Sequence, residues 1–254
     1  MDDRQLLRYS RHVLLPAVDI DGQERILASH VLVVGAGGLG SPVILYLAAA
    51  GVGRITVIDP DQVDDSNLQR QIMHGVADVG RPKAESAADA VARLGADARV
   101  TVICEPFSAD NGDALVASAD VCVDCSDNFA TRFLLNRLAV KYRKPLVSGA
   151  AIRLEGQLAV FDARREDSPC YRCLYPETGE EDMRCSNNGV LAPVVGVIGA
   201  LQATEVLKLL VGMPGVATAR LLVWDAAVAA FRSHRVKRDP GCPVCGSEAI
   251  TAGT

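Results

Sequence analysis

The chain has 254 residues, 49% of them hydrophobic and 22% charged, which is enough to build one large α/β domain around its own core. Its 26 basic and 31 acidic residues give a net charge of −5, and only 4% of residues are aromatic. This balance argues against nucleic acid or an anionic membrane as the main partner. The N-terminus lacks the features of a secretory signal. We therefore expect a cytoplasmic protein whose eight cysteines serve as metal ligands, catalytic thiols or packing residues.

The first half of the chain alternates short apolar strands with helices. A short helical arm is expected first, followed by helices near residues 42–50, 82–94 and 128–143 and by strands at 31–34, 54–59, 100–104, 120–125 and 146–150. The charge-free window 31–53 is long enough to span a membrane, but its glycines and Pro42 favour a strand, a turn and a helix. Strands that are apolar on both faces predict a Rossmann-like, mostly parallel sheet covered by helices on both faces.

The pattern changes after residue 151. We expect an antiparallel hairpin around Glu155-Gly156, a polar excursion over 164–188, a long apolar helix over 190–211 and two strands within 220–236. The expected organisation is a single domain over residues 1–254. It comprises an N-terminal helical arm (1–30), a nucleotide-binding half (31–151) and a C-terminal part (152–254) with antiparallel strands, a crossover loop and a four-cysteine zinc site.

A glycine-rich turn joins the first predicted strand to the next helix. Gly35, Gly37, Gly38 and Gly40 allow a tight turn and close approach of a phosphate, and the helix N-terminus supplies N–H donors. Asp59 ends the next strand and can accept hydrogen bonds from ribose hydroxyls. The turn predicts a nucleotide site but does not distinguish a dinucleotide from ATP.

Two cationic residues after the second strand favour a triphosphate. Lys83 lies in the first turn of its helix, where the helix dipole disfavours a cation unless an anion is near. Arg70, in the stretch 66–71, can bind a phosphate oxygen through a forked hydrogen bond. Taken singly, each is also compatible with a solvated surface charge.

The fourth strand ends in Asp124-Cys-Ser-Asp127-Asn128, at the sheet edge where open α/β folds bind ligands. Asp127 is expected to cap the next helix, to bind Mg²⁺, or to do both. One carboxylate is enough for a Mg²⁺ that also contacts substrate phosphates.

Two Cys-x-x-Cys pairs are candidate metal ligands. Cys170, Cys173, Cys242 and Cys245 can complete a tetrahedral, structural Zn²⁺ site, the alternatives being free thiols or a redox pair. Cys122 and Cys125 have the same spacing, but on an extended strand they point to opposite faces, so we expect packing there. Cys185 is either a nucleophile or an ordinary loop cysteine.

Together these motifs resemble the ThiF/MoeB-type, ubiquitin-activating-enzyme-like adenylyltransferases of sulfur-carrier proteins. The resemblance extends from Arg8-Tyr-Ser-Arg11 through the glycine turn, Ser66-Asn-Leu-Gln-Arg-Gln71, Arg81-Pro-Lys83, Asp124-Cys-Ser-Asp-Asn128 and Gly149-Ala-Ala to both cysteine pairs.

The resemblance implies an enzyme that uses Mg·ATP to adenylate the C-terminal glycine carboxylate of a small ubiquitin-like sulfur carrier ending in Gly-Gly. It implies a homodimer in which Arg11 reaches the partner's nucleotide, a role for Cys185 with the activated carrier, and a sulfurtransferase as a further partner. The expected catalytic residues are Arg11, Arg70, Lys83, Asp127 and Cys185. The expected nucleotide-site residues are Gly35, Gly37, Gly38, Gly40, Asp59, Ser66, Asn67, Leu68, Gln69, Arg70, Lys83, Asp127 and Asn128. Thiamine and molybdopterin synthesis are both open as pathways.

Two other functions are compatible with parts of the sequence. The glycine turn and Asp59 also fit an NAD-dependent dehydrogenase. The cysteine pairs also fit a non-catalytic module that binds a ubiquitin-like protein.

Overall fold

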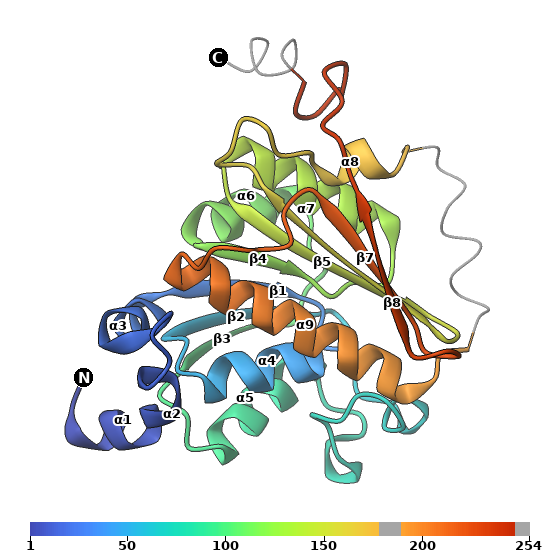
Figure 1. Cartoon of the computed structure of the whole chain (residues 1–254). Coiled ribbons are helices and arrows are strands. Elements are labelled where there is room, and N and C mark those ends of the chain that lie inside the picture. The colour runs from blue at the N-terminus through green and yellow to red at the C-terminus, as the bar shows by residue number, and fades with distance from the viewer. Residues whose placement is uncertain (178–188, 247–254) are drawn as a thin grey trace.

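The computed structural model describes residues 1–177 and 189–246. They build an eight-stranded sheet with helices on both faces, in the order β3-β2-β1-β4-β5-β6-β7-β8 (Figure 1). The first five strands are parallel and the last three antiparallel. The strands are β1 His30–Val34, β2 Arg54–Ile58, β3 Arg99–Ile103, β4 Val121–Asp124, β5 Pro145–Ile152, β6 Glu155–Asp162, β7 Arg220–Asp225 and β8 Ala230–Arg235. The predicted Rossmann-like fold with antiparallel C-terminal strands is confirmed.

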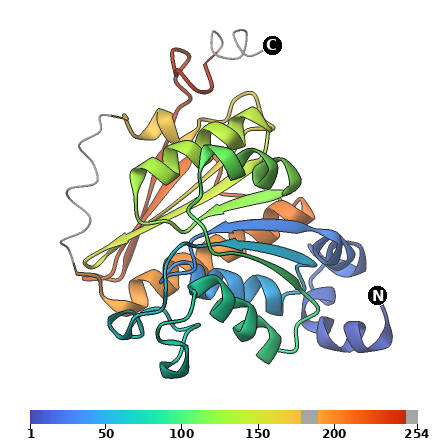
Figure 2. The same cartoon turned by 180° about the vertical axis from the view of Figure 1, so that it is seen from behind.

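Helices cover the two faces of the sheet separately. One face packs against α3 (Asp19–Ala28), α4 (Gly40–Ala49), α5 (Lys83–Arg93) and α9 (Ala192–Val211). The other packs against α6 (Ala109–Ser118), α7 (Phe129–Lys141) and the short α8 (Tyr171–Leu174), as Figure 2 shows from behind. Each face has its own apolar core, because the central strands are buried on both sides.

The N-terminal arm consists of α1 (Asp3–Arg8), α2 (Ser10–Val13) and α3. It packs on the C-terminal ends of the neighbouring helices: Gln23 donates to the carbonyl of Ala50 after α4, and Arg8 donates to the carbonyl of Leu94 after α5. The arm therefore lies at the amino ends of the parallel strands, away from the glycine turn that follows β1 (Figure 1).

Helix α9 begins at Ala192 with Pro193 in its first turn and ends before Gly212, whose φ is 74°. Within the described part of the chain it is the one helix long and apolar enough to cross a membrane, and 56% of its most apolar window is buried inside the molecule. The window 31–53 is the predicted strand, turn and helix.

Two details differ from the sequence prediction. The β5–β6 turn lies at Arg153-Leu154 and not at Glu155-Gly156, because Gly156 pairs within β6. A Cβ on Gly156 would lie 2.3 Å from Ile198 Cγ1, so this glycine allows α9 to approach the sheet. Helix α6 was not predicted, because polar residues and Gly112 obscure its apolar face.

Candidate nucleotide and metal sites

The glycine turn between β1 and α4 is held by its surroundings. Gly35 has a φ of 101°, and a Cβ there would lie 2.6 Å from the carbonyl oxygen of Cys125, so only glycine fits. The Ala36 N–H donates to Asp59 Oδ2 at 2.7 Å. Helix α4 begins without a side-chain cap, which leaves N–H groups at its N-terminus available to a ligand.

Asp59 is 5% exposed at the end of β2, and its second oxygen accepts from the Asp61 N–H at 2.8 Å. Burial raises the pKa of this carboxyl, although the two backbone hydrogen bonds and Lys83 oppose that effect. Each carboxylate oxygen has one more lone pair, so the expected bonds to a ribose are still possible. The contribution of Asp59 to the geometry of the turn could not be read from the sequence.

Lys83 is the first residue of α5 and its side chain is 8% exposed. Its ammonium group lies 2.8 Å from Asp61 Oδ2, on a carboxylate that is 62% exposed. The sequence prediction missed Asp61, whose carboxylate forms an ion pair with the ammonium group of Lys83. An ammonium group has three donors, so this contact leaves Lys83 able to bind a phosphate.

The segment 66–71 lies at the carboxyl edge of the sheet, where Gln71 approaches the glycine turn. Ser66 and Asn67 belong to a short 3₁₀ helix, and Arg70 donates to the carbonyl of Ser66 at 3.3 Å. Leu68 is half-buried and Gln69 is exposed. Among residues 1–177 and 189–246, no carboxylate forms an ion pair with the guanidinium of Arg70.

Gln71 lies against the glycine turn and was not among the predicted site residues. It is 4% exposed, and a Cβ on Gly37 would lie 3.5 Å from its Nε2. Among the residues described, its Oε1 is the buried side-chain oxygen or nitrogen that has no hydrogen-bond partner. Packing within the chain therefore explains neither this free amide oxygen nor the glycine at position 37.

His74 also holds the glycine turn, through the carbonyl of Ala36. Its Nε2 lies 2.9 Å from the Ala36 carbonyl oxygen and its Nδ1 lies 2.8 Å from Ser86 Oγ. A carbonyl only accepts, so the neutral ring carries its proton on Nε2 and accepts from the Ser86 hydroxyl at Nδ1. Burial lowers the pKa of His74, while the Ala36 bond and Asp78 oppose the shift.

This arrangement predicts a stability that falls with acidification. The folded pKa of His74 lies below the ordinary value of 6.5, so the unfolded chain takes up more protons as the pH drops through that value. We expect the Tm to fall between about pH 7.5 and about pH 5.5, and to fall less in His74→Gln. Thermal melts across this range test it, with His234→Gln on the exposed strand β8 as control. Equal pH dependence in the wild type and His74→Gln would contradict it.

Asp127 follows β4 at the same edge of the sheet and is exposed. Of the two roles expected for Asp127, the helix cap is wrong: Asn128 is the N-cap of α7 and accepts from the Thr131 N–H at 2.9 Å. Asn128 Nδ2 lies 3.4 Å from Asp127 Oδ1. Because the cap uses Asn128, the carboxylate of Asp127 is available to a cation.

The four predicted cysteine ligands come together between α8 and the C-terminal segment. Their sulfur atoms all lie within 4.8 Å of one another, with Cys170–Cys242 at 3.7 Å and Cys173–Cys245 at 3.4 Å. Four thiolates around Zn²⁺ at about 2.3 Å would stand about 3.8 Å apart, so the cluster has the size of such a site. The Asp239 N–H donates to Cys173 Sγ at 3.5 Å, and Asn136 Nδ2 donates to Cys170 Sγ at 3.6 Å.

The other cysteines behave differently. Cys122 and Cys125 pack into opposite cores, as their strand spacing predicts. Burial raises the pKa of the Cys122 thiol to about 12 and that of Cys125 well above its usual value. Cys185 lies outside the described residues, so its predicted role stays a prediction.

Arg11, on α2, is exposed and lies with the arm at the opposite end of the strands from the glycine turn.

The fold and these sites define a Rossmann-like α/β protein with a glycine turn and a four-cysteine cluster. The chain belongs to the ThiF family, whose model matches residues 9–244.

The chain is 46% identical to the molybdopterin-synthase adenylyltransferase of Escherichia coli strain K12, over 97% of this chain and 98% of that protein. It is 43% identical to the sulfur carrier protein ThiS adenylyltransferase of the same strain, over 97% of each. A crystal structure of Escherichia coli MccB with succinimide has the same fold, with a TM-score of 0.79, 24% identity and coverage of 94% of this chain and 74% of that one.

Proposed function

We propose that this protein uses Mg·ATP to adenylate the C-terminal glycine carboxylate of a small ubiquitin-like sulfur carrier ending in Gly-Gly, releasing pyrophosphate. Family membership and the two adenylyltransferases that match nearly the full chain carry the proposal. Their names point to molybdopterin or thiamine synthesis, and their similar identities of 46% and 43% do not separate the two pathways.

The nucleotide would lie at the carboxyl edge of β1, β2 and β4. The uncapped N-terminus of α4 fits a ligand with phosphate groups, and Gln71, beside Gly37, carries a buried amide oxygen that could accept a hydrogen bond. Lys83 and Arg70 would bind the phosphates. Asp127 fits a Mg²⁺ site, since it is an exposed carboxylate that the helix cap does not use. When bound, Mg²⁺ would neutralise part of the phosphate charge.

The reaction needs alignment and charge neutralisation more than proton transfer. The carrier's carboxylate is already ionised near neutral pH, so it can attack the α-phosphorus without a general base. A new bond forms between a carboxylate oxygen and the α-phosphorus, and the bond to the β,γ-pyrophosphate breaks. The cations stabilise the negative charge that develops on the phosphates. A sulfur nucleophile can later displace AMP from the product, which is where a sulfurtransferase and Cys185 would act.

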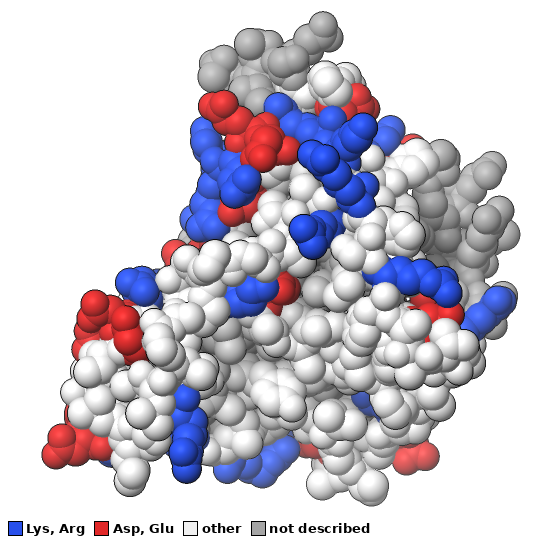
Figure 3. Space-filling view, in the orientation of Figure 1, with Lys and Arg blue, Asp and Glu red and all other residues white. Residues whose placement is uncertain are grey.

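The arm also supports an association of two copies. Large apolar side chains are exposed on α1–α4 and on the segments between them, with Leu7 at 79%, Leu14 at 70% and Tyr46 at 58%. Charges are sparse over the lower part of the molecule, around α4 and α9, whereas Lys and Arg gather toward the top around β7 and β8 (Figure 3). Arg11 lies in this apolar region and far from its own glycine turn, which fits its predicted contact with a partner's nucleotide.

The four cysteines would hold a structural Zn²⁺, because four thiolates leave no open coordination position for water. We expect the protein to act as a single cytoplasmic domain.

Carrier-dependent exchange of radioactive pyrophosphate into ATP tests the function. The carriers that accompany molybdopterin and thiamine synthesis would be supplied separately, and the one that stimulates exchange identifies the pathway. Near-normal exchange in all of Lys83→Ala, Arg70→Ala and Asp127→Ala would contradict the assigned roles. Tight NADH binding without ATP binding would favour a dehydrogenase, and carrier binding that is indifferent to nucleotide would favour a non-catalytic module.

A further inference from the structure

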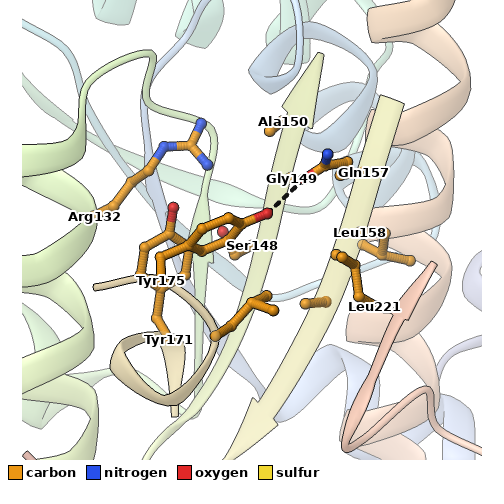
Figure 4. A pocket seen from close by; sticks show the side chains of 11 residues that line it. Arg132, Ser148, Gly149, Ala150, Gln157, Leu158, Tyr171, Tyr175 and Leu221 are labelled. Atoms are coloured by element: carbon orange, nitrogen blue, oxygen red, sulfur yellow. Dashed lines mark hydrogen bonds between the residues drawn. The ribbon is translucent and has the colours of Figure 1, made fainter. Parts of the chain in front are cut away.

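A buried ion pair lies next to the Asp127 turn and does not belong to the proposed nucleotide contacts. Asp124, the last residue of β4, is 1% exposed, and Arg132, on the first turns of α7, is 8% exposed. Arg132 Nη1 lies 3.5 Å from Asp124 Oδ2. Figure 4 shows the Arg132 side chain extending from α7 toward the strands, above Tyr171 and Tyr175.

Both members of this pair bind Ser126, the residue before Asp127. Asp124 Oδ1 accepts from the Ser126 N–H at 3.0 Å and from its hydroxyl at 2.6 Å. Arg132 Nη2 donates to the Ser126 carbonyl at 2.6 Å. The peptide groups on both sides of Ser126 are therefore held, and the direction in which the chain enters Asp127 is fixed.

A neighbouring strand and a helix hold Asp124 in turn. Its Oδ2 accepts from the Ser148 hydroxyl of β5 at 2.7 Å, and its carbonyl accepts from Gln202 Nε2 of α9 at 2.7 Å. Gln202 is fully buried, and a Cβ on Gly149 would lie 2.4 Å from its Oε1, so the glycine of Gly149-Ala-Ala makes room for this amide. The Asp127 turn is thus tied to β5, α7 and α9.

Neither a gain in folding stability nor the binding of a ligand beside Arg132 explains why Asp124 and Arg132 form a buried ion pair. Replacing a buried ion pair by apolar side chains of similar volume is often neutral or stabilising, because desolvation offsets the attraction. The cavity beside Arg132, lined also by Ser148, Gln157 and Tyr175, measures about 10 Å³, which is room for about one water molecule. Besides their contacts with Ser148 and Tyr171, the two charged groups hold Ser126 from both sides.

We propose that Asp124 and Arg132 are positioning residues that orient Asp127, and that they thereby set the apparent Mg²⁺ affinity of the nucleotide site. This inference rests on the proposed function, in which Asp127 holds Mg²⁺. Removing residues that orient a metal ligand typically weakens metal binding by about 10- to 100-fold.

The test compares variants that differ in charge balance. Arg132→Met alone leaves the buried Asp124 unpaired and is expected to lower the Tm. Asp124→Asn combined with Arg132→Met removes both charges and is expected to recover much of that loss. Arg132→Lys keeps a donor near Ser126 and should give an intermediate effect. Arg137→Met is the matched control, because Arg137 lies on the same helix and pairs with Glu177 at the surface.

Two measurements report on the chain segment around Asp127 without requiring catalysis. Calorimetric titration of ATP at a series of Mg²⁺ concentrations gives the Mg²⁺ concentration at half-maximal binding, which should rise about tenfold in the folded double variant and less than twofold in Arg137→Met. Hydrogen exchange should accelerate at the amides of residues 125–128 in the double variant and change less elsewhere.

A purely structural role would lower the Tm and leave the half-maximal Mg²⁺ concentration unchanged. That result in the double variant, or in Arg132→Lys if the double variant does not fold, would overturn the proposal. A wild-type protein that binds ATP without any dependence on Mg²⁺ would instead contradict the proposed function, while the hydrogen-exchange result would still test the role of the pair in the turn.

Discussion

Replacing Lys83 by alanine is expected to reduce carrier-dependent pyrophosphate exchange by about 100- to 1,000-fold, the usual effect of removing one well-placed group that stabilises transition-state charge. The ammonium group is held at the proposed phosphate site by the start of α5 and by Asp61, 2.8 Å away. The loss should appear mainly in the exchange rate at saturating carrier, because the lysine would act on charge that develops on the phosphates.

The fold should survive this change, because Asp61 is 62% exposed and water can solvate it when the lysine is absent. Lys141→Ala is the matched control: Lys141 also pairs with a carboxylate, that of Asp113 at 2.6 Å, but at the exposed end of α7. Exchange in Lys83→Ala equal to that in Lys141→Ala would show that the lysine does not bind the phosphates.

Removal of one cysteine ligand has the second large expected effect. Wild-type protein purified without chelator should contain about one zinc ion per chain, and Cys242→Ser should contain almost none, since three thiolates bind the ion far less tightly than four. We expect its Tm to fall by on the order of 10 °C. The cluster joins the α8 region to the C-terminal segment and lies outside both main cores, so the helical content should persist.

Elemental analysis, thermal melts and far-ultraviolet circular dichroism measure these three quantities. Cys104→Ser is the control, because Cys104 is an exposed thiol outside the cluster. Full metal content in Cys242→Ser would contradict the four-thiolate site. Complete unfolding of that variant would show that the metal is needed for the fold and does not merely strengthen it.

Local sequence patterns were sufficient to predict a feature wherever that feature depends on residues close together in the chain. The glycine turn, the apolar strands and the start of α9 near Pro193 follow from backbone constraints that act over a few residues. The paired Cys-x-x-Cys spacing likewise predicted the cluster that the fold assembles. Helix α6 escaped prediction, because its polar first turn and Gly112 hide the apolar residues that face the core.

Contacts between residues that are far apart in the sequence could not be predicted from local patterns. Asp61 beside Lys83, His74 on the carbonyl of Ala36, and Arg132 on the carbonyl of Ser126 each join residues whose spacing follows no motif. Gly156 illustrates the same limit, since it looked like a turn residue and is a packing residue under α9.

By itself, the order of residues determined the strands, most of the helices, the glycine turn at the carboxyl edge of the sheet, and which cysteines gather. Only the tertiary structure decided how those side chains are held: which carboxylate satisfies the lysine, which residue caps α7, and which charges are buried beside Asp127. The physical reason is that helix and strand formation depends on short-range backbone and apolar patterns, whereas a buried polar group must find its hydrogen-bond partner wherever the packed chain places one.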